Sequence, residues 1–294
     1  MTDVTMNAAV ETVPEPEPGF VKRLLRNPLG ATGSLIVGLL FLGAVASAFG
    51  WVPFDPIAQT PADRFSPPSS TYWFGTDQFG RDIFSRVLAG LKISFQVAIV
   101  SVTIASIVGT TVGVLAGFSG GKIDAITMRL ADVLFAFPAI LLALVIVTAL
   151  GTGWLNASIA IAVVYTPVFV RVARGPTLQV KSADYVRAGV GLGFSTPRII
   201  FGHVLPNISS AVIVQITLSL SWAILTESAL SFLGLGTQPP EASLGLMVSS
   251  ARVFAVIAWW TLVFPSLAIV LAVLGLNLLG DGLRDAIDPS RRDS

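Results

Sequence analysis

Six apolar stretches dominate this sequence, and each is long enough to cross a membrane as a helix, which takes about 20 residues. Only 12% of all residues are charged and the mean hydropathy is +0.80, whereas about 25% of the residues in a soluble domain carry charge. We therefore expect an all-α integral membrane protein with about six transmembrane helices. The predicted spans cover about 29–49, 93–118, 125–150, 154–173, 208–233 and 256–280.

The composition excludes several kinds of chemistry. The 294-residue chain has no cysteine and one histidine, His203, which excludes disulfides, thiolate ligands and multi-histidine metal centres. Its 18 basic and 17 acidic residues nearly cancel, so no basic surplus favours nucleic acid. We predict no catalytic residue, no metal site, no nucleic-acid partner and no enzymatic activity in this chain.

The first 28 residues form a polar segment that ends in a basic cluster, Lys22, Arg23 and Arg26. The apolar run that follows carries small residues at 44–48 that resemble cleavage sites, so a secretory signal is one interpretation. The apolar region of a signal covers about 7–15 residues, and this run is longer. We favour an uncleaved first span preceded by a tail at 1–28.

Basic residues predict the orientation of the spans, since cytoplasmic loops are enriched in lysine and arginine. With six crossings and a cytoplasmic N-terminus, thirteen of the 18 basic residues fall in cytoplasmic segments. We therefore predict that a membrane domain at 29–280 lies between two cytoplasmic termini, and that the C-terminal tail covers 281–294.

Two patterns predict how the second span begins and packs. Ile83, Val87 and Leu91 share one face of an expected short surface helix at about 82–92, just before the span. Small residues then recur at every fourth position and permit the close approach of another helix. We favour packing within the chain over a subunit interface for this stripe, which is Ala105, Gly109, Gly113 and Gly117.

Prolines and charged residues are exceptional inside spans. Pro138, Pro167 and Pro265 predict kinks. Arg129 and Asp132 are three residues apart in sequence, so they share one helix face and are expected to pair.

Glu227 is a carboxylate within the fifth apolar stretch. An ionisable residue there is costly and usually faces a cavity or a partner. One interpretation makes it a candidate pathway residue that meets a substrate amine. The other interpretation, which we favour, is a structural hydrogen bond that anchors the following SFLGLG segment.

The polar interval between the fourth and fifth spans, about 174–207, predicts two short amphipathic helices. Ser182 is expected to cap the first helix and Ser195 the second. Gly193 stands where a left-handed residue closes a helix, and Pro206 is expected to end the second helix before the fifth span. A simple linker would not need two capped helices, whereas an element that docks to a cytoplasmic partner would.

This loop resembles the EAA loop of permease subunits of bacterial ABC importers. The family pattern is Glu-Ala-Ala, three residues, Gly, nine residues, and an apolar-x-Leu-Pro ending. Arg187, Ala188 and Gly189 occupy the first three positions, with Arg187 in place of Glu and Gly189 in place of Ala. Gly193 falls on the required glycine, and residues 203–206 form the ending, with a histidine as its first residue. The resemblance assigns ATPase coupling through residues 182–206 to Asp184, Arg187, Ala188, Gly189, Gly193, His203, Leu205 and Pro206.

Further segments resemble the second permease of the dipeptide, oligopeptide and nickel group. They are NPLG (27–30), GTDQFGRDIFSRVLAG (75–90), ADVLFAFP (131–138), ESALSFLGLGTQPP (227–240), SLG (243–245) and DGLRDAIDP (281–289). The resemblance implies a type I ABC importer permease fold in the lipid of a bacterial plasma (inner) membrane. It also implies a second homologous permease, two cytoplasmic ATPases that bind ATP and Mg, an extracytoplasmic substrate-binding protein, and no cofactor in this chain.

The chain has no nucleotide-binding motif of its own. The nearest segment, AGFSGGKI at 116–123, contains Gly-Lys but lacks the leading glycine and the final Ser or Thr of a phosphate-binding loop. We interpret it as a turn between the second and third spans.

The resemblance implies the transmembrane subunit of an ATP-driven importer that forms half of a pathway for peptides or similar small solutes. Closure of the ATPases would move the loops at 182–206, and the outer segments 50–92 and 231–255 would touch the binding protein. A stand-alone secondary carrier or channel is the alternative, although the sequence has no convincing inverted repeat. A membrane enzyme is a third class, which the single histidine and the lack of cysteine disfavour. Peptides are the default substrate, with nickel chelates, glutathione and other solutes left open.

Overall fold

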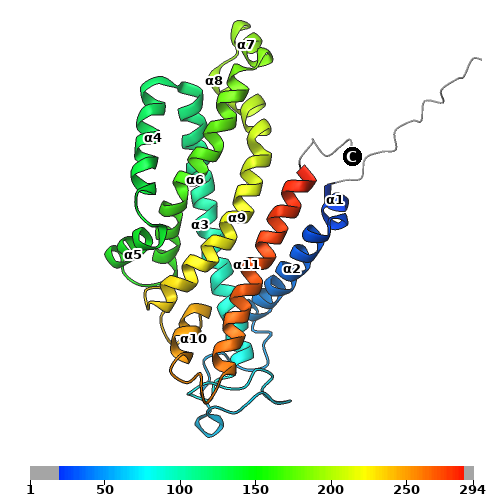
Figure 1. Cartoon of the computed structure of the whole chain (residues 1–294), viewed down its shortest axis with the longest axis vertical. Coiled ribbons are helices and arrows are strands. Elements are labelled where there is room, and N and C mark those ends of the chain that lie inside the picture. The colour runs from blue at the N-terminus through cyan, green and yellow to red at the C-terminus, as the bar shows by residue number, and fades with distance from the viewer. Residues whose placement is uncertain (1–19, 288–294) are drawn as a thin grey trace, which may run out of the picture.

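A computed structural model describes residues 20–287, which form a bundle of helices without a β-sheet in that range (Figure 1). Five helical stretches are long and apolar enough to cross a membrane, and a bent helix pair adds a sixth when it is counted as one span. This arrangement confirms the predicted fold class. The five stretches contain α2 (Pro28–Ala48), α3 (Ile83–Ser119), α6 (Trp154–Ser182), α9 (Leu205–Phe232) and α11 (Trp260–Ile287).

The bent pair consists of α4 (Gly121–Phe135) and α5 (Ala139–Leu150), which meet at an angle of 91°. The sequence predicted a single kinked span at this place, and the structure breaks it. Pro138 explains the break, because it has no backbone N–H to donate and disfavours a helical conformation in the residue before it. Its own backbone is extended, with ψ of 128°. As a result, α5 lies across the long axis of the bundle (Figure 1).

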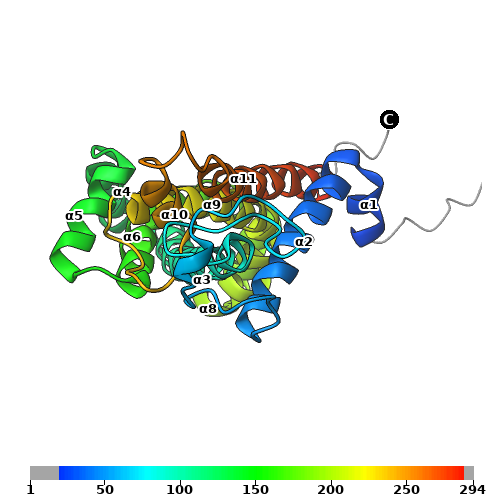
Figure 2. The same cartoon turned by 90° about the horizontal axis from the view of Figure 1, so that it is seen from below.

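The long helices run between two ends of the molecule (Figure 1). One end, here called the loop end, holds α7 (Asp184–Gly191) and α8 (Thr196–Ile199). The opposite end, here called the α10 end, holds α10 (Leu244–Ala251) and the irregular segment 49–82, which contains the short helix η1 (Pro61–Asp63), and Figure 2 shows this end from below. The helix α1 (Phe20–Arg26) and the last turns of α11 both point towards the loop end. A chain that crosses the bundle an even number of times must begin and end on the same side.

The predicted terminal tails are partly helical. Residues 20–26 form α1, and α11 continues to Ile287, so the segment 281–287 extends the last long helix. The ends are joined by a hydrogen bond that Asn27 Nδ2 donates to Asp285 Oδ2 at 2.9 Å. The remainder of the two predicted tails, 1–19 and 288–294, lies outside the described residues.

The expected surface helix at 82–92 is the first part of α3 and not a separate element. Asp82 starts α3, since its Oδ2 accepts a hydrogen bond from the Ser85 backbone N–H at 2.8 Å. The face formed by Ile83, Val87 and Leu91 is buried. No proline interrupts the chain from the start of α3 to its end, so the amphipathic turns and the apolar span form one helix.

The stripe of small residues on α3 packs against α6. A Cβ atom at Gly109 would lie 2.6 Å from the Thr166 carbonyl oxygen, and one at Gly113 would lie 2.4 Å from that of Val170. No side chain fits at such distances, so the two backbones approach this closely only because these positions are glycine. The stripe therefore serves packing within the chain, as the sequence analysis favoured.

Candidate functional site

The loop between α6 and α9 projects from the loop end and contains α7 and α8 (Figure 1). The first predicted cap is wrong. The N-cap of α7 is Ala183, and the Ser182 hydroxyl instead donates to the Gln179 carbonyl at 2.8 Å. A serine at the end of a helix can satisfy a carbonyl of its own last turn, and this local bond competes with capping of the next helix.

Gly193 reverses the chain after α7, as predicted. Its φ is +80°, a conformation that costs residues with a Cβ about 1–2 kcal/mol. The N–H of Gly193 donates to the Val190 carbonyl and that of Phe194 to the Gly189 carbonyl, both at 3.0 Å. This pair of bonds is a Schellman closure. A Cβ at Gly189 would lie 3.3 Å from the Phe194 ring, so the small residue at this position gives the ring room.

The second loop helix runs into α9 and is not stopped by Pro206. Ser195 stands at the N-cap of α8, although its side chain makes no capping hydrogen bond. After α8 the chain passes through a π-helical turn, Ile200–Val204, into α9. The Leu205 N–H reaches back five residues to the Ile200 carbonyl. This wider turn directly precedes Pro206, so the helix passes the proline without the regular bonding that a proline disrupts.

A small apolar cluster holds the loop together. Val186, Ile199, Val204 and Ile208 are buried in it, and Phe194 packs against them. The loop is thus a folded element that packs against the ends of α3, α6 and α9. It is not the plain linker that was the alternative.

The predicted coupling residues differ in their exposure. Asp184, Arg187 and Ala188 are exposed on α7, and neither charged side chain has an ionic partner within the part of the chain that the structure describes. Gly189 is buried under Phe194, as the closure requires. The remaining members are exposed or partly buried; they are Gly193, His203, Leu205 and Pro206.

The tip of the loop carries exposed apolar side chains. Leu192 is 76% exposed and Phe201 is 71% exposed. The same loop also forms a hollow of about 600 Å³, which Lys181, Arg187, Ser182 and Thr196 line together with apolar residues. Exposed apolar groups beside a hollow with basic rims are typical of protein-docking surfaces.

Glu227 of α9 is buried against α3. Only 1% of its surface is exposed. Its Oε2 accepts a hydrogen bond from Ser94 Oγ of α3 at 2.8 Å, and its Oε1 accepts one from Ser231 Oγ at 2.7 Å. This geometry supports the structural alternative for Glu227 over the pathway role.

The sequence analysis missed a group of polar side chains, here called the polar face, at the break between α4 and α5. A hollow of about 300 Å³ lies there, and Tyr165, Gln215 and Ser219 line it together with apolar residues such as Trp222. The Tyr165 hydroxyl and Thr226 Oγ1 are 3.1 Å apart, and Gln215 donates to Ser219 Oγ at 3.1 Å. Interrupted helices often form substrate sites in transporters, so Pro138 together with the polar residues of the fifth span was the available signal.

Ion pairs attach α4 to α6. Asp132 pairs with Arg171 at 2.6 Å, and not with Arg129 as predicted. Arg174 pairs with Asp124 through both carboxylate oxygens. The long arginine side chains of α6 reach across the interface, whereas a pair three residues apart on α4 would have to form along its exposed surface.

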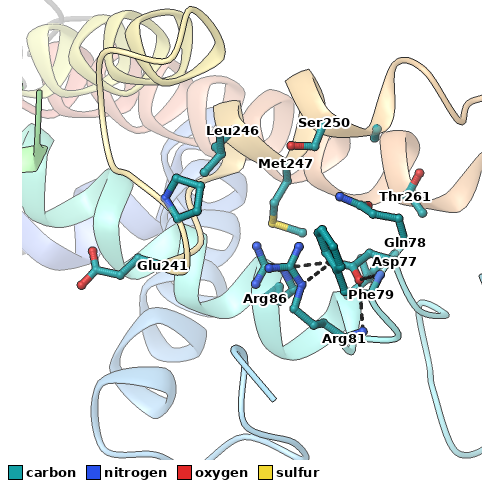
Figure 3. A pocket seen from close by; sticks show the side chains of 13 residues that line it. Asp77, Gln78, Phe79, Arg81, Arg86, Glu241, Leu246, Met247, Ser250 and Thr261 are labelled. Atoms are coloured by element: carbon teal, nitrogen blue, oxygen red, sulfur yellow. Dashed lines mark hydrogen bonds and ion pairs between the residues drawn. The ribbon is translucent and has the colours of Figure 1, made fainter. Parts of the chain in front are cut away.

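A third cavity, here called the outer pocket, lies at the α10 end and has a volume of about 190 Å³ (Figure 3). Asp77, Arg81 and Arg86 line it, and all three are buried. Met247 and Ser250 of α10 form the facing wall. The sequence analysis included the three charged residues only as part of a family pattern, because the burial of so polar a segment is a tertiary property.

Comparisons with known proteins found a matching family and several similar proteins. Residues 109–293 match the family described as "Binding-protein-dependent transport system inner membrane component". The chain is 44% identical to the dipeptide transport system permease protein DppC of Alkalihalophilus pseudofirmus, over 92% of this chain and 89% of the relative. It is 44% identical to the glutathione transport system permease protein GsiD of Pectobacterium atrosepticum, over 92% and 90%. It is 42% identical to the di/tripeptide transport system permease protein DppC of Pseudomonas aeruginosa, over 96% and 94%.

Proposed function

The chain belongs to the inner-membrane components of binding-protein-dependent transport systems, and we propose that it forms half of a translocation pathway for short peptides. It is a transmembrane permease subunit of an ATP-driven importer and is not itself an enzyme. Its helices make it a multi-pass inner-membrane protein. The folded loop at 182–206, which projects from one end of the bundle, is the observation that carries the proposal of ATPase coupling.

Peptides are the proposed substrates. Three relatives are named for the transport of dipeptides, glutathione, and di- or tripeptides. The polar face at the break between α4 and α5 supports this choice, because the amide of Gln215 and the hydroxyl groups of Ser219 and Tyr165 can exchange hydrogen bonds with peptide groups. We therefore propose this face, in place of Glu227, as the contribution of this subunit to the pathway.

The proposed partners are a second homologous permease, two ATPases and an extracytoplasmic binding protein. The transport family implies a complex with ATPases and a binding protein. The exposed Leu192 and the hollow lined by Lys181 and Arg187 support docking of an ATPase at the loop end. ATP and Mg would be bound by the ATPases, and this chain would contribute the coupling residues alone.

We propose that the loop end and both termini face the cytoplasm, and that the α10 end faces outwards. The distribution of basic residues supports this orientation. Segments 50–92 and 231–255 would then meet the binding protein. ATPases that prefer one state of the permease when they bind ATP would draw the loop at 182–206 and the corresponding loop of the second permease together. That preference would drive alternating access.

The experiment is uptake of a labelled dipeptide into proteoliposomes that contain the complete complex, with ATP inside and the binding protein outside. The proposal predicts uptake that requires both ATP hydrolysis and the binding protein. Uptake that follows an ion gradient and continues without ATP would instead identify a stand-alone carrier. Transport of a nickel chelate without transport of any peptide would overturn the proposed substrate class.

A further inference from the structure

The outer pocket brings two buried arginines to one buried carboxylate. Arg86 is 4% exposed and Arg81 is 8% exposed, and the carboxylate between them is that of Asp77. Arg81 Nε lies 2.7 Å from Asp77 Oδ2, and Arg86 Nε lies 3.7 Å from the same oxygen. Glu241, also at the pocket, is exposed and its carboxylate points away from this cluster (Figure 3). Two guanidinium groups therefore share one carboxylate.

Both carboxylate oxygens of Asp77 already accept hydrogen bonds from its own loop. Its Oδ1 accepts hydrogen bonds from the backbone N–H groups of Phe79 and Arg81, at 2.8 and 3.1 Å. Arg86 Nη1 donates to the Pro56 carbonyl at 2.7 Å. Across residues 20–287, Arg86 Nη2 and the two Nη atoms of Arg81 donate no hydrogen bond. Guanidinium N–H groups that line a cavity and have no acceptor can bind a carboxylate through charge-assisted hydrogen bonds.

We propose that the outer pocket receives one carboxylate side chain, of Asp or Glu, from the extracytoplasmic binding protein. This inference rests on the proposed function, since it places the α10 end outside the cell and in contact with that protein. The inserted carboxylate would accept hydrogen bonds from the unused donors of Arg81 and Arg86. It would thereby orient the docked binding protein over the pathway.

The size of the pocket favours a single side chain over a transported solute. Sites for whole small molecules have volumes of about 300–1,000 Å³, whereas this cavity holds about 190 Å³. Its surroundings favour a protein as the source of that side chain. Phe79, which lines the pocket, is 44% exposed. An aromatic side chain beside buried arginines is typical of a binding hot spot.

The test is to fill the pocket with an internal carboxylate. Met247→Glu places one on α10 beside the two arginines, and Met247→Gln measures the effect of size and polarity alone. Ala62→Glu adds the same charge to the exposed part of the outer segment, and it controls for long-range repulsion. Each variant is assembled with its partner permease and ATPases in nanodiscs. The readouts are the Kd of the peptide-loaded binding protein and the ATP hydrolysis that it stimulates.

We expect Met247→Glu to raise the Kd at least about tenfold relative to Met247→Gln, as loss of a buried charge contact does, and Ala62→Glu to change it much less. Ser250→Glu, compared with Ser250→Gln, repeats the test from the next turn of α10 if the first variant fails to assemble. In the binding protein, one Asp→Asn or Glu→Gln substitution should raise the Kd for the wild-type complex and have little further effect on Met247→Glu.

Equal Kd values for the Glu and Gln variants, or an equal effect of Ala62→Glu, would overturn the inference. So would an unchanged Kd combined with lost discrimination between a dipeptide and its C-terminal amide, because the pocket would then bind the carboxylate of the substrate. These results leave the proposed function intact when the wild-type complex imports peptide. Failure of the wild-type complex to import any peptide would instead refute the proposed function.

Discussion

Ser94 Oγ of α3 donates a hydrogen bond to Glu227 Oε2 of α9 at 2.8 Å, and this contact joins two helices that are far apart in sequence. Ser231 occupies the other carboxylate oxygen at 2.7 Å. Because Glu227 is buried within the subunit, we expect it to fix the position of α9 against α3 and not to contact a passing solute. Because the end of α9 leads towards α10, the same contact also positions the segment 231–255.

A substitution series separates this positioning role from a pathway role. Glu227→Gln keeps the shape and can still bond both serines, so uptake should stay above about half of the wild-type value. Glu227→Leu leaves the buried Ser94 hydroxyl without its partner, which costs about 1–3 kcal/mol, and should lower the Tm and the yield of assembled complex. The measurements are thermal unfolding in detergent and peptide uptake per assembled complex. Strongly reduced uptake by Glu227→Gln, with Tm and assembly unchanged, would place Glu227 in the pathway.

The contact between α3 and α6 gives a matched pair of glycine substitutions. A Cβ at Gly113 would lie 2.4 Å from a backbone oxygen, whereas one at Gly38, within α2, would meet nothing within 4 Å. Gly113→Ala should therefore destabilise the protein by about 1–3 kcal/mol, as overpacking does. Gly38→Ala should be neutral or stabilising, because alanine favours a helix by up to about 1 kcal/mol. Equal Tm values for the two variants would contradict the close approach of these helices.

The two arginines of α6 should contribute unequally to stability. The pair Arg174–Asp124 is bidentate, and its side chains are 30% and 17% exposed, whereas those of Arg171 and Asp132 are 49% and 62% exposed. Exposed pairs contribute about 0–1 kcal/mol, and hydrogen bonds to charged groups in protected sites about 1.5–3 kcal/mol. Arg174→Ala should therefore lower the Tm more than Arg171→Ala. The reverse order would show that the partly buried pair is not the main tie between α4 and α6.

The orientation can be tested because the natural chain has no cysteine. Thr60→Cys lies at the α10 end and Val190→Cys at the loop end, and both positions are exposed. In right-side-out vesicles, a membrane-impermeant maleimide should label position 60 at once. Position 190 should react only after permeabilisation. The opposite pattern would reverse the assignment of both ends of the molecule.

Local sequence patterns predicted the elements that local physics determines. Apolar length located the spans, and small-residue spacing located the face of α3 on which another helix of the chain packs. The position of Gly193 located a chain reversal that only a left-handed residue closes easily. The errors came from competing interactions that the patterns do not encode. The Ser182 hydroxyl donates a hydrogen bond to a carbonyl of its own helix and does not cap the next one. A π-helical turn precedes Pro206, so the helix that the proline was expected to end continues past it.

The candidate site was harder to predict because it depends on contacts between distant segments. Glu227 is anomalous in an apolar stretch whichever role it has, and only the position of Ser94 distinguishes the roles. The outer pocket needs Arg86 to be buried beside Asp77, which their spacing alone does not show. The polar face around Gln215 could not be predicted because the hollow that it lines lies at the break between α4 and α5.

The central claim, that the folded loop couples this permease to ATPases, is tested by substitutions at two glycines two residues apart. Gly193 has a φ of +80° and Gly191 does not have a positive φ, while a Cβ at either position would meet nothing within 4 Å. Gly193→Val should therefore misdirect α8 through backbone strain of more than about 1–2 kcal/mol. Gly191→Val introduces the same side chain on the exposed end of α7 without that strain.

The direct measurement is ATPase retention and substrate-stimulated ATP hydrolysis in purified complexes carrying either substitution. The account predicts that both variants insert into the membrane and pair with the second permease. Gly193→Val alone should lose its ATPases or at least about 90% of the stimulated hydrolysis. Such a tenfold loss corresponds to about 1.4 kcal/mol of coupling free energy. Normal retention together with normal stimulated hydrolysis in Gly193→Val would contradict the coupling role of this loop.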